Sequence, residues 1–240
     1  MNFLITMAGR GQRFVDRGYA DPKMLIVVRG KTLLEWSLDS LPLELCSRLV
    51  FVGLAEHERR YNMSARISAL LPRTRDVRYR WLESVTRGQA ETALAARPDV
   101  DESRPLVIFN IDTRFVSKTM AAALKDDSSD GVLGAFPSRE PRFSFAAASP
   151  DGTVTDVREK EVISSHALTG LYSFRYCSDF FDTAAQWIRD GKRVRNEFYI
   201  APMYADLIRK GRRFTLDHAE VVDILGTPEE VAVFAKAGMR

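Results

Sequence analysis

Residues 7–14 read Met7-Ala8-Gly9-Arg10-Gly11-Gln12-Arg13-Phe14, and Pro22-Lys23 follow shortly afterwards. The short apolar run Asn2–Thr6 comes directly before them and suits a first buried strand. A turn that contains glycine lets backbone N–H groups approach phosphate oxygens, because no Cβ stands in the way. Arg13 and Lys23 add two cations to the same neighbourhood. The stretch therefore predicts a strand, a phosphate-binding loop and two cations, which together describe a nucleoside triphosphate site.

The loop by itself is also compatible with a surface turn after an edge strand. It is not a P-loop, because the Gly-Lys-Ser/Thr sequence is absent. It does not match the Rossmann fingerprint either, because Gly9 and Gly11 lack a third glycine three residues later. The choice between a triphosphate site and a plain turn depends on the rest of the chain.

Composition narrows the class of protein. A chain of 240 residues, 45% hydrophobic and 28% charged, is ordinary for a globular protein that buries a substantial core. A net charge of +3 is too small to favour nucleic acid as a partner. The sequence has no long apolar span and no signal peptide, so we expect no membrane association. Cys46 and Cys177 have no metal or redox spacing and are interpreted as reduced thiols of a cytoplasmic protein.

The first half of the chain alternates apolar runs with helical patterns. This alternation predicts right-handed crossovers and a mostly parallel sheet covered by helices. The expected strands are Asn2–Thr6, Arg48–Gly53, Val77–Leu82 and Leu106–Phe109, and the expected helices are Thr32–Leu41, Ala55–Leu71 and Gly88–Ala96.

The second half adds shorter strands and further helices. We expect strands at Gly131–Phe136, Phe143–Ala148, Thr153–Val157 and Leu168–Phe174, and helices at Ser178–Arg189 and Phe198–Lys210. A last helix has Thr227 as its N-cap, Pro228 in its first turn and Glu230 closing a capping box. No repeat or change of composition divides the chain, so residues 1–240 are interpreted as a single domain.

Two carboxylates follow predicted strands. Asp112 ends the run 106–112, and Asp223 ends a second apolar run just before the last helix. Ligands of open parallel sheets bind beyond the carboxyl ends of the strands, where two such groups can converge on one hard cation. The three histidines are isolated in sequence, and no serine elbow or zinc motif occurs. Phosphate-binding cations, two metal carboxylates and no side-chain nucleophile suit phosphoryl-type transfer.

These residues resemble the nucleotidyltransferase family that activates sugar phosphates and related phospho-compounds. Residues 7–14 with Pro22-Lys23 resemble its first-strand signature, Leu-Ala-(Ala/Gly)-Gly-x-Gly-(Ser/Thr)-Arg-(Leu/Phe) followed by Pro-Lys, with Gln12 in place of Ser/Thr. The likeness continues in the same order through seven further segments: 25–35, Arg87-Gly88-Gln89-Ala90, Asn110-Ile111-Asp112, Glu159-Lys160, 169–174, 196–199 and 223–228. It spans nearly the whole chain, and this collinearity makes it more specific than any single motif.

The resemblance implies a fold and a set of roles. The implied fold is a three-layer α/β/α sandwich with a Rossmann-like, mixed and mostly parallel sheet, the GT-A-like nucleotidyltransferase fold. The implied catalytic residues are Arg13 and Lys23, and the implied Mg²⁺ ligands are Asp112 and Asp223. The remaining roles are nucleotide binding by Ala8, Gly9, Arg10, Gly11, Gln12 and Gln89, and acceptor binding by Glu159, Lys160 and Gly170.

The implied partners are a nucleoside triphosphate and a phosphorylated small acceptor, with pyrophosphate as the leaving group. A sugar 1-phosphate is the favoured acceptor. Glu161 in place of the family's proline and the short first loop keep a CTP-dependent cytidylyltransferase with a phosphocholine-like acceptor open as an alternative. An alternative of another class is a nucleotide- or sugar-binding module without turnover. The base, the pathway and whether the chain forms a homo-oligomer are left open.

Overall fold

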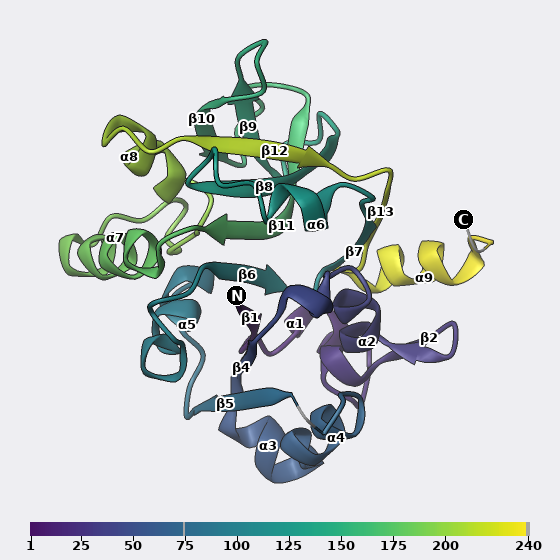
Figure 1. Ribbon diagram of the computed structural model, residues 1–240. Coiled ribbons are helices and arrows are strands. Elements are labelled where there is room, and N and C mark those ends of the chain that lie inside the picture. Colours follow the sequence, from purple (N-terminus) through teal and green to yellow (C-terminus); the bar gives the residue numbers. More distant parts are fainter. Residues whose placement is uncertain (74, 239–240) are drawn as a thin grey trace.

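Parallel strands form the centre of the sheet (Figure 1). The structure is a computed structural model that describes residues 1–73 and 75–238. β1 (Asn2–Met7) lies between β4 (Arg48–Leu54) and β6 (Leu106–Asn110), and β5 (Asp76–Leu82) extends the sheet beyond β4. Every residue of β1 is buried, as expected for an apolar strand with neighbours on both sides. These strands confirm the parallel half of the predicted sheet.

The second half of the chain continues the same sheet with antiparallel pairs. β11 (His166–Phe174) runs antiparallel to β6 and joins both groups of strands. β8 (Gly131–Pro137) pairs with β11, and β12 (Phe214–His218) runs parallel to β8. The hairpin of β9 (Ser144–Ala148) and β10 (Val154–Glu159) pairs with β11 through β9. The nine-stranded sheet is therefore mixed, and the predicted α/β class is confirmed.

Helices cover both faces of this sheet because β1 alternates its side chains between two apolar clusters. Leu4 packs in one cluster with α5 (Gln89–Leu94) and α7 (Cys177–Asp190). Phe3 and Ile5 pack in the other cluster with α2 (Leu33–Leu38) and α4 (Met63–Ala69). Figure 1 shows the resulting helix, sheet and helix layers.

The remaining elements lie outside the nine-stranded sheet, and most of them are short. A small antiparallel pair, β7 (Thr113–Val116) and β13 (Val221–Ile224), brings the end of the chain back beside β6. The other bounds are α1 (Gln12–Val15), a 3-10 turn at Lys23–Leu25, β2 (Val27–Val28), β3 (Lys31–Thr32), 3-10 turns at Leu43–Leu45 and Arg97–Asp99, α3 (Ala55–Tyr61), α6 (Met120–Ala123), α8 (Met203–Arg209) and α9 (Pro228–Lys236). Within the described ranges, no helix is long and apolar enough to cross a membrane.

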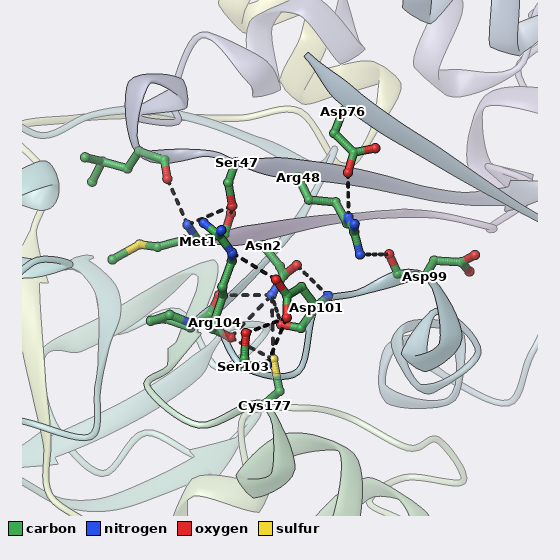
Figure 2. A network of polar contacts seen from close by, with 12 residues as sticks. Met1, Asn2, Ser47, Arg48, Asp76, Asp99, Asp101, Ser103, Arg104 and Cys177 are labelled. Atoms are coloured by element: carbon green, nitrogen blue, oxygen red, sulfur yellow. Dashed lines mark hydrogen bonds and ion pairs between the residues drawn. The ribbon is translucent and has the colours of Figure 1, made fainter. Parts of the chain in front are cut away.

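A polar network holds the amino ends of the central strands (Figure 2). Asn2 is fully buried, and its amide donates to the Asp101 carbonyl at 2.8 Å while its Oδ1 accepts from the Asp101 N–H at 2.9 Å. Cys177 donates its thiol hydrogen to the Arg104 carbonyl at 3.1 Å. Burial raises the pKa of the Cys177 thiol to about 12, so this cysteine is a structural thiol. The network fixes the strands at the end of the sheet opposite to Asp112.

Two predicted helices depart most from their predicted bounds. The helix expected over Ala55–Leu71 is two helices, because Asn62 adopts the left-handed conformation (φ 50°) between α3 and α4. Asparagine tolerates that conformation, and the Glu58 carboxylate then accepts the N–H of Ser64 at 2.8 Å. The helix expected from Phe198 begins only after Pro202, since a proline disfavours helical backbone at the residue before it.

Candidate active site

One cleft opens beyond the carboxyl ends of β1 and β6. It consists of three adjoining cavities of about 550, 590 and 330 Å³, and Asp112 and Tyr199 line all three. This is the edge at which open α/β sheets bind ligands. A separate cavity of about 270 Å³ lies at the opposite ends of the strands, beside Met1 and Arg175, and none of the predicted site residues lines it.

Lys23 and Asp112 form an ion pair at the centre of the cleft. Lys23 Nζ lies 2.6 Å from Asp112 Oδ1, and the Lys23 side chain is 8% exposed whereas that of Asp112 is 51% exposed. The Lys23 ammonium also lies over the Phe14 ring, 5.6 Å from its centroid. The structure thus brings together two predicted residues that are 89 positions apart, with the lysine fixed and the carboxylate accessible.

The glycine loop forms one wall of the cleft. Gly9, Gly11 and Gln12 line it together with Arg13, and Ala8 lines the adjoining cavity. Within the described chain, the backbone N–H groups of residues 9–12 make no hydrogen bond, so they are available to a ligand. Arg13 is exposed and forms no ion pair with a described residue.

Two members of the loop have protein partners. Arg10 lies outside the three cavities, and its Nε is 3.2 Å from a carboxylate oxygen of Glu56. Gln12 donates from Nε2 to the Asp16 carboxylate at 2.7 Å, an interaction that a serine or threonine hydroxyl is too short to make. Gln12 therefore stays at the edge of the cleft, as part of the first turn of α1.

Gln89 lies at the base of the second cavity. Its amide Nε2 donates to Thr6 Oγ1 at 3.2 Å, which fixes the orientation of the side chain. Gly88 precedes it, and a Cβ at this position would lie 2.5 Å from the backbone of Phe198. The close approach allows Phe198 to accept the Ala90 N–H at 2.9 Å, which joins this turn to the segment that carries Tyr199.

The predicted acceptor residues line the third cavity. Lys160 Nζ donates to Tyr199 Oη at 2.6 Å and lies 3.9 Å from Glu159 Oε1. The Glu159 side chain is 5% exposed, and its burial raises the pKa of the carboxyl group above the usual range. Gly170 has φ 91°, and a Cβ there would lie 2.7 Å from the side-chain nitrogen of Asn110. Glycine is therefore required at position 170 both for backbone conformation and for space.

Asp223 does not line the cleft. Its Oδ2 accepts from the Arg114 guanidinium at 2.6 Å, opposite it in the β7–β13 pair. Among the described residues that line the three cavities, Ile224 and Gly226 are present but Asp223 is not. The side chains of Asp223 and Ile224 point to opposite faces because neighbouring strand residues alternate. The structure does not bring Asp223 into the cleft with Asp112.

Sequence reasoning missed three polar groups of the third cavity. Arg142, from the turn between β8 and β9, forms an ion pair with Glu230 of α9, and Ser144 donates to Glu159. Thr227 does cap α9 by accepting the Glu230 N–H at 3.2 Å, but the Glu230 side chain does not return to the cap. The predicted capping box is wrong in this half, because the carboxylate turns towards Arg142 instead.

Two of the histidines, which are isolated in sequence, meet in the structure. His166 on β11 and His218 on β12 lie 3.0 Å apart between Nδ1 and Nε2. Their strands both pair with β8, which the sequence did not indicate. Burial and the neighbouring His166 lower the pKa of His218. Neither histidine lines the cleft.

Solved structures share this architecture over 97–100% of their length. A nucleoside-diphosphate-sugar pyrophosphorylase from Vibrio cholerae RC9 is 29% identical, with a TM-score of 0.84 over 98% of this chain and 100% of that one. A putative glucose-1-phosphate thymidylyltransferase from Bacillus anthracis is 17% identical, with a TM-score of 0.77 over 100% and 97% of the two chains. An inositol-1-phosphate CTP transferase from T. maritima is 13% identical, with a TM-score of 0.76 over 100% and 97%.

Sequence comparison gives the family directly. A comparison with curated proteins finds no match. The profile of the MobA-like NTP transferase domain matches residues 3–196, which include the glycine loop, Lys23, Gln89 and Asp112. The solved structures above agree with that match in fold. The chain therefore belongs to the nucleotidyltransferases that have a MobA-like NTP transferase domain.

Proposed function

We propose that the protein transfers a nucleoside monophosphate from a nucleoside triphosphate to a sugar 1-phosphate, releasing pyrophosphate. The observation that carries the proposal is the position of the Lys23–Asp112 pair. It lies where the cavity lined by the glycine loop meets the cavity lined by the acceptor residues. A triphosphate on one side and a phosphorylated acceptor on the other would meet at this pair.

In the proposed reaction, an oxygen of the acceptor phosphate attacks the α-phosphorus in line, and the bond to the β-phosphate oxygen breaks. The free N–H groups of residues 9–12 hold the triphosphate, and Arg13 neutralises the pyrophosphate that leaves. Lys23 offsets the charge that gathers at the α-phosphate. Gln89, held by Thr6, contacts the base. No protein nucleophile is needed, because the acceptor supplies the attacking oxygen.

We propose Mg²⁺ as the cofactor. Asp112 fits this role because its Oδ2 is free of the Lys23 pair and its side chain is half exposed in the cleft. Mg²⁺ commonly binds through one or two carboxylates together with substrate phosphates and water. When bound, it would supply charge neutralisation and a template for the two phosphates.

The lining of the acceptor cavity supports a sugar. It contains hydroxyl groups of Ser144, Thr169 and Tyr172 and the buried carboxylate of Glu159, which suit hydrogen bonding to a hydroxyl-rich ring. The Vibrio cholerae structure, a nucleoside-diphosphate-sugar pyrophosphorylase, adds support by its 29% identity.

A phosphocholine-like acceptor is the second candidate, because Phe143, Tyr172 and Tyr199 also line the cavity and aromatic rings bind quaternary ammonium groups. However, Arg142 already lies 4.6 Å from the Phe143 centroid, and Lys160 lies 4.7 Å from the Tyr199 centroid. Two of the three rings thus face protein cations, which favours the sugar.

The test is pyrophosphate release with Mg²⁺ across five nucleoside triphosphates and four acceptors: glucose 1-phosphate, mannose 1-phosphate, inositol 1-phosphate and phosphocholine. We expect release that requires a sugar 1-phosphate. Release with phosphocholine and CTP alone would favour the second candidate. Binding of nucleotide without release for any pair would favour a binding module without turnover.

A further inference from the structure

The Glu230 carboxylate is turned into the cleft although its backbone belongs to the first turn of α9. Its Oε1 is engaged by Arg142, while its Oε2 is buried and has no hydrogen-bond partner among the described residues. The side chain is only 15% exposed. A buried carboxylate oxygen without a donor or a cation is destabilising, so such an atom indicates a missing partner.

Gly226 leaves an open point between this oxygen and Asp112. A Cβ built on Gly226 would lie 3.2 Å from Glu230 Oε2 and 3.8 Å from Asp112 Oδ2. Both oxygens therefore face the same small space, from the end of β6 and from α9. A side chain at position 226 would occupy that point, which glycine leaves without one.

The second oxygen of each carboxylate is held by a protein cation. Lys23 holds Asp112 Oδ1 at 2.6 Å, and Arg142 holds Glu230 Oε1. Each carboxylate thus has one oxygen fixed by its own ion pair and a second oxygen within 4 Å of a Cβ built on Gly226. Asp223 offers no comparable atom there, because it pairs with Arg114 outside the cleft at 2.6 Å.

We infer that Asp112 and Glu230, rather than Asp112 and Asp223, are the two protein carboxylates that bind the divalent cation. The inference rests on the proposed function, which requires a cation beside the triphosphate. Two protein carboxylates are sufficient for Mg²⁺, since substrate phosphates and water complete its coordination. It also accounts for the orphaned Glu230 oxygen, for the open position at Gly226 and for the rotation of Glu230 away from the helix cap.

The test is binding of Mn²⁺ to the whole chain, measured by electron paramagnetic resonance with Mn²⁺ alone and with each of the five triphosphates. Loss of groups around a metal commonly lowers its affinity by about 10- to 100-fold, and we expect at least the lower value for Glu230→Gln and for Asp112→Asn. Asp223→Asn should stay within about twofold of the wild type, because its carboxylate is outside the cleft.

Two further variants exclude a merely structural role for Glu230. Glu229→Gln removes the neighbouring carboxylate of the same helix, which pairs with Arg17 at the surface, and should leave Mn²⁺ affinity unchanged. Arg142→Gln breaks the same ion pair as Glu230→Gln but keeps the carboxylate, so it should retain Mn²⁺ or bind it more tightly. Thermal melting of each variant confirms that it is folded.

The inference is overturned if Glu230→Gln binds Mn²⁺ like the wild type, if Asp223→Asn weakens binding as much as Glu230→Gln, or if Arg142→Gln loses Mn²⁺ to the same extent. Absence of bound Mn²⁺ in the wild type under every condition also overturns it. A different measurement tests the proposed function: it fails if the wild-type chain releases no pyrophosphate with any acceptor of the panel.

Discussion

Replacing Lys23 by methionine removes the cation that faces the proposed α-phosphate but keeps an unbranched side chain beside the Phe14 ring. The Lys23 side chain is 8% exposed and its ammonium lies 2.6 Å from Asp112. Loss of a group that stabilises charge in the transition state typically costs about 2.7–4 kcal/mol. We therefore expect kcat/KM to fall by about 100- to 1,000-fold.

The same substitution should change stability far less. Removing one partner of a fully buried ion pair costs about 3–5 kcal/mol, because the other charge stays buried without compensation. Here the charge that remains is Asp112, which is 51% exposed and can be hydrated. The expected loss is nearer to that of an exposed pair, about 0.2–1 kcal/mol. The free energy lost from the transition state should thus exceed the free energy lost from folding, by at least the equivalent of about a tenfold change in rate.

The assay is initial-rate pyrophosphate release, together with the free energy of unfolding from urea titration. Lys31→Met is the matched control, since Lys31 pairs with exposed Asp39 and lies over Trp36 outside the cleft. It should retain activity within about twofold, as expected for a surface ion pair. Near wild-type kcat/KM in Lys23→Met, or an equal loss in Lys31→Met, would contradict a role of Lys23 at the α-phosphate.

Three other predictions concern Glu159, Gly170 and Cys177. Burial raises the folded pKa of Glu159, so the native state is destabilised as pH rises through that pKa; the Tm of Glu159→Gln relative to the wild type should increase from pH 4 to pH 8, and a constant difference would contradict this. Gly170→Ala places a Cβ 2.7 Å from Asn110 at φ 91°, so calorimetry should show a lower Tm, and an unchanged Tm would show that the site relaxes. Cys177, whose pKa burial raises to about 12, should not react with a thiol reagent at pH 8 until the protein unfolds, and rapid labelling of the native chain would disprove its burial.

The parallel half of the fold could be predicted from sequence because its signals are local and strong. β1, β4 and β6 are short apolar runs that alternate with helical patterns, and a right-handed crossover leaves few arrangements for them. The position of Asp112 beyond β6 followed from the same rule. The sequence could predict that Asp112 and Lys23 lie at the same edge of the sheet, but not that they form an ion pair.

In the antiparallel half, β8, β9, β10 and β11 could be predicted as strands, whereas β12 could not. β8 pairs with both β11 and β12, and their sequences do not predict this, because strand pairing depends on contacts between residues far apart in sequence. The contact between His166 and His218 depends on that pairing, so two histidines separated by 51 residues were described as isolated.

The direction of single side chains was the least predictable feature. Asp223 and Glu230 both belong to segments whose secondary structure was predicted, yet each carboxylate pairs with an arginine that the sequence did not connect to it. A one-residue alternation decides that Ile224 lines the cleft and Asp223 does not. Thr227 caps α9 without help from the Glu230 side chain, so the Glu230 carboxylate can turn into the cleft.

In the proposed reaction the acceptor phosphate, and not water or a side chain, attacks the α-phosphorus at the Lys23–Asp112 pair. The most direct measurement uses an acceptor whose phosphate carries ¹⁸O, chosen as the one that gives the fastest pyrophosphate release, with the product followed by ³¹P nuclear magnetic resonance. We expect one nucleotide-linked product per pyrophosphate, with ¹⁸O in the bridge between its two phosphorus atoms. Free nucleoside monophosphate in its place, or bound nucleotide with no pyrophosphate, would contradict it.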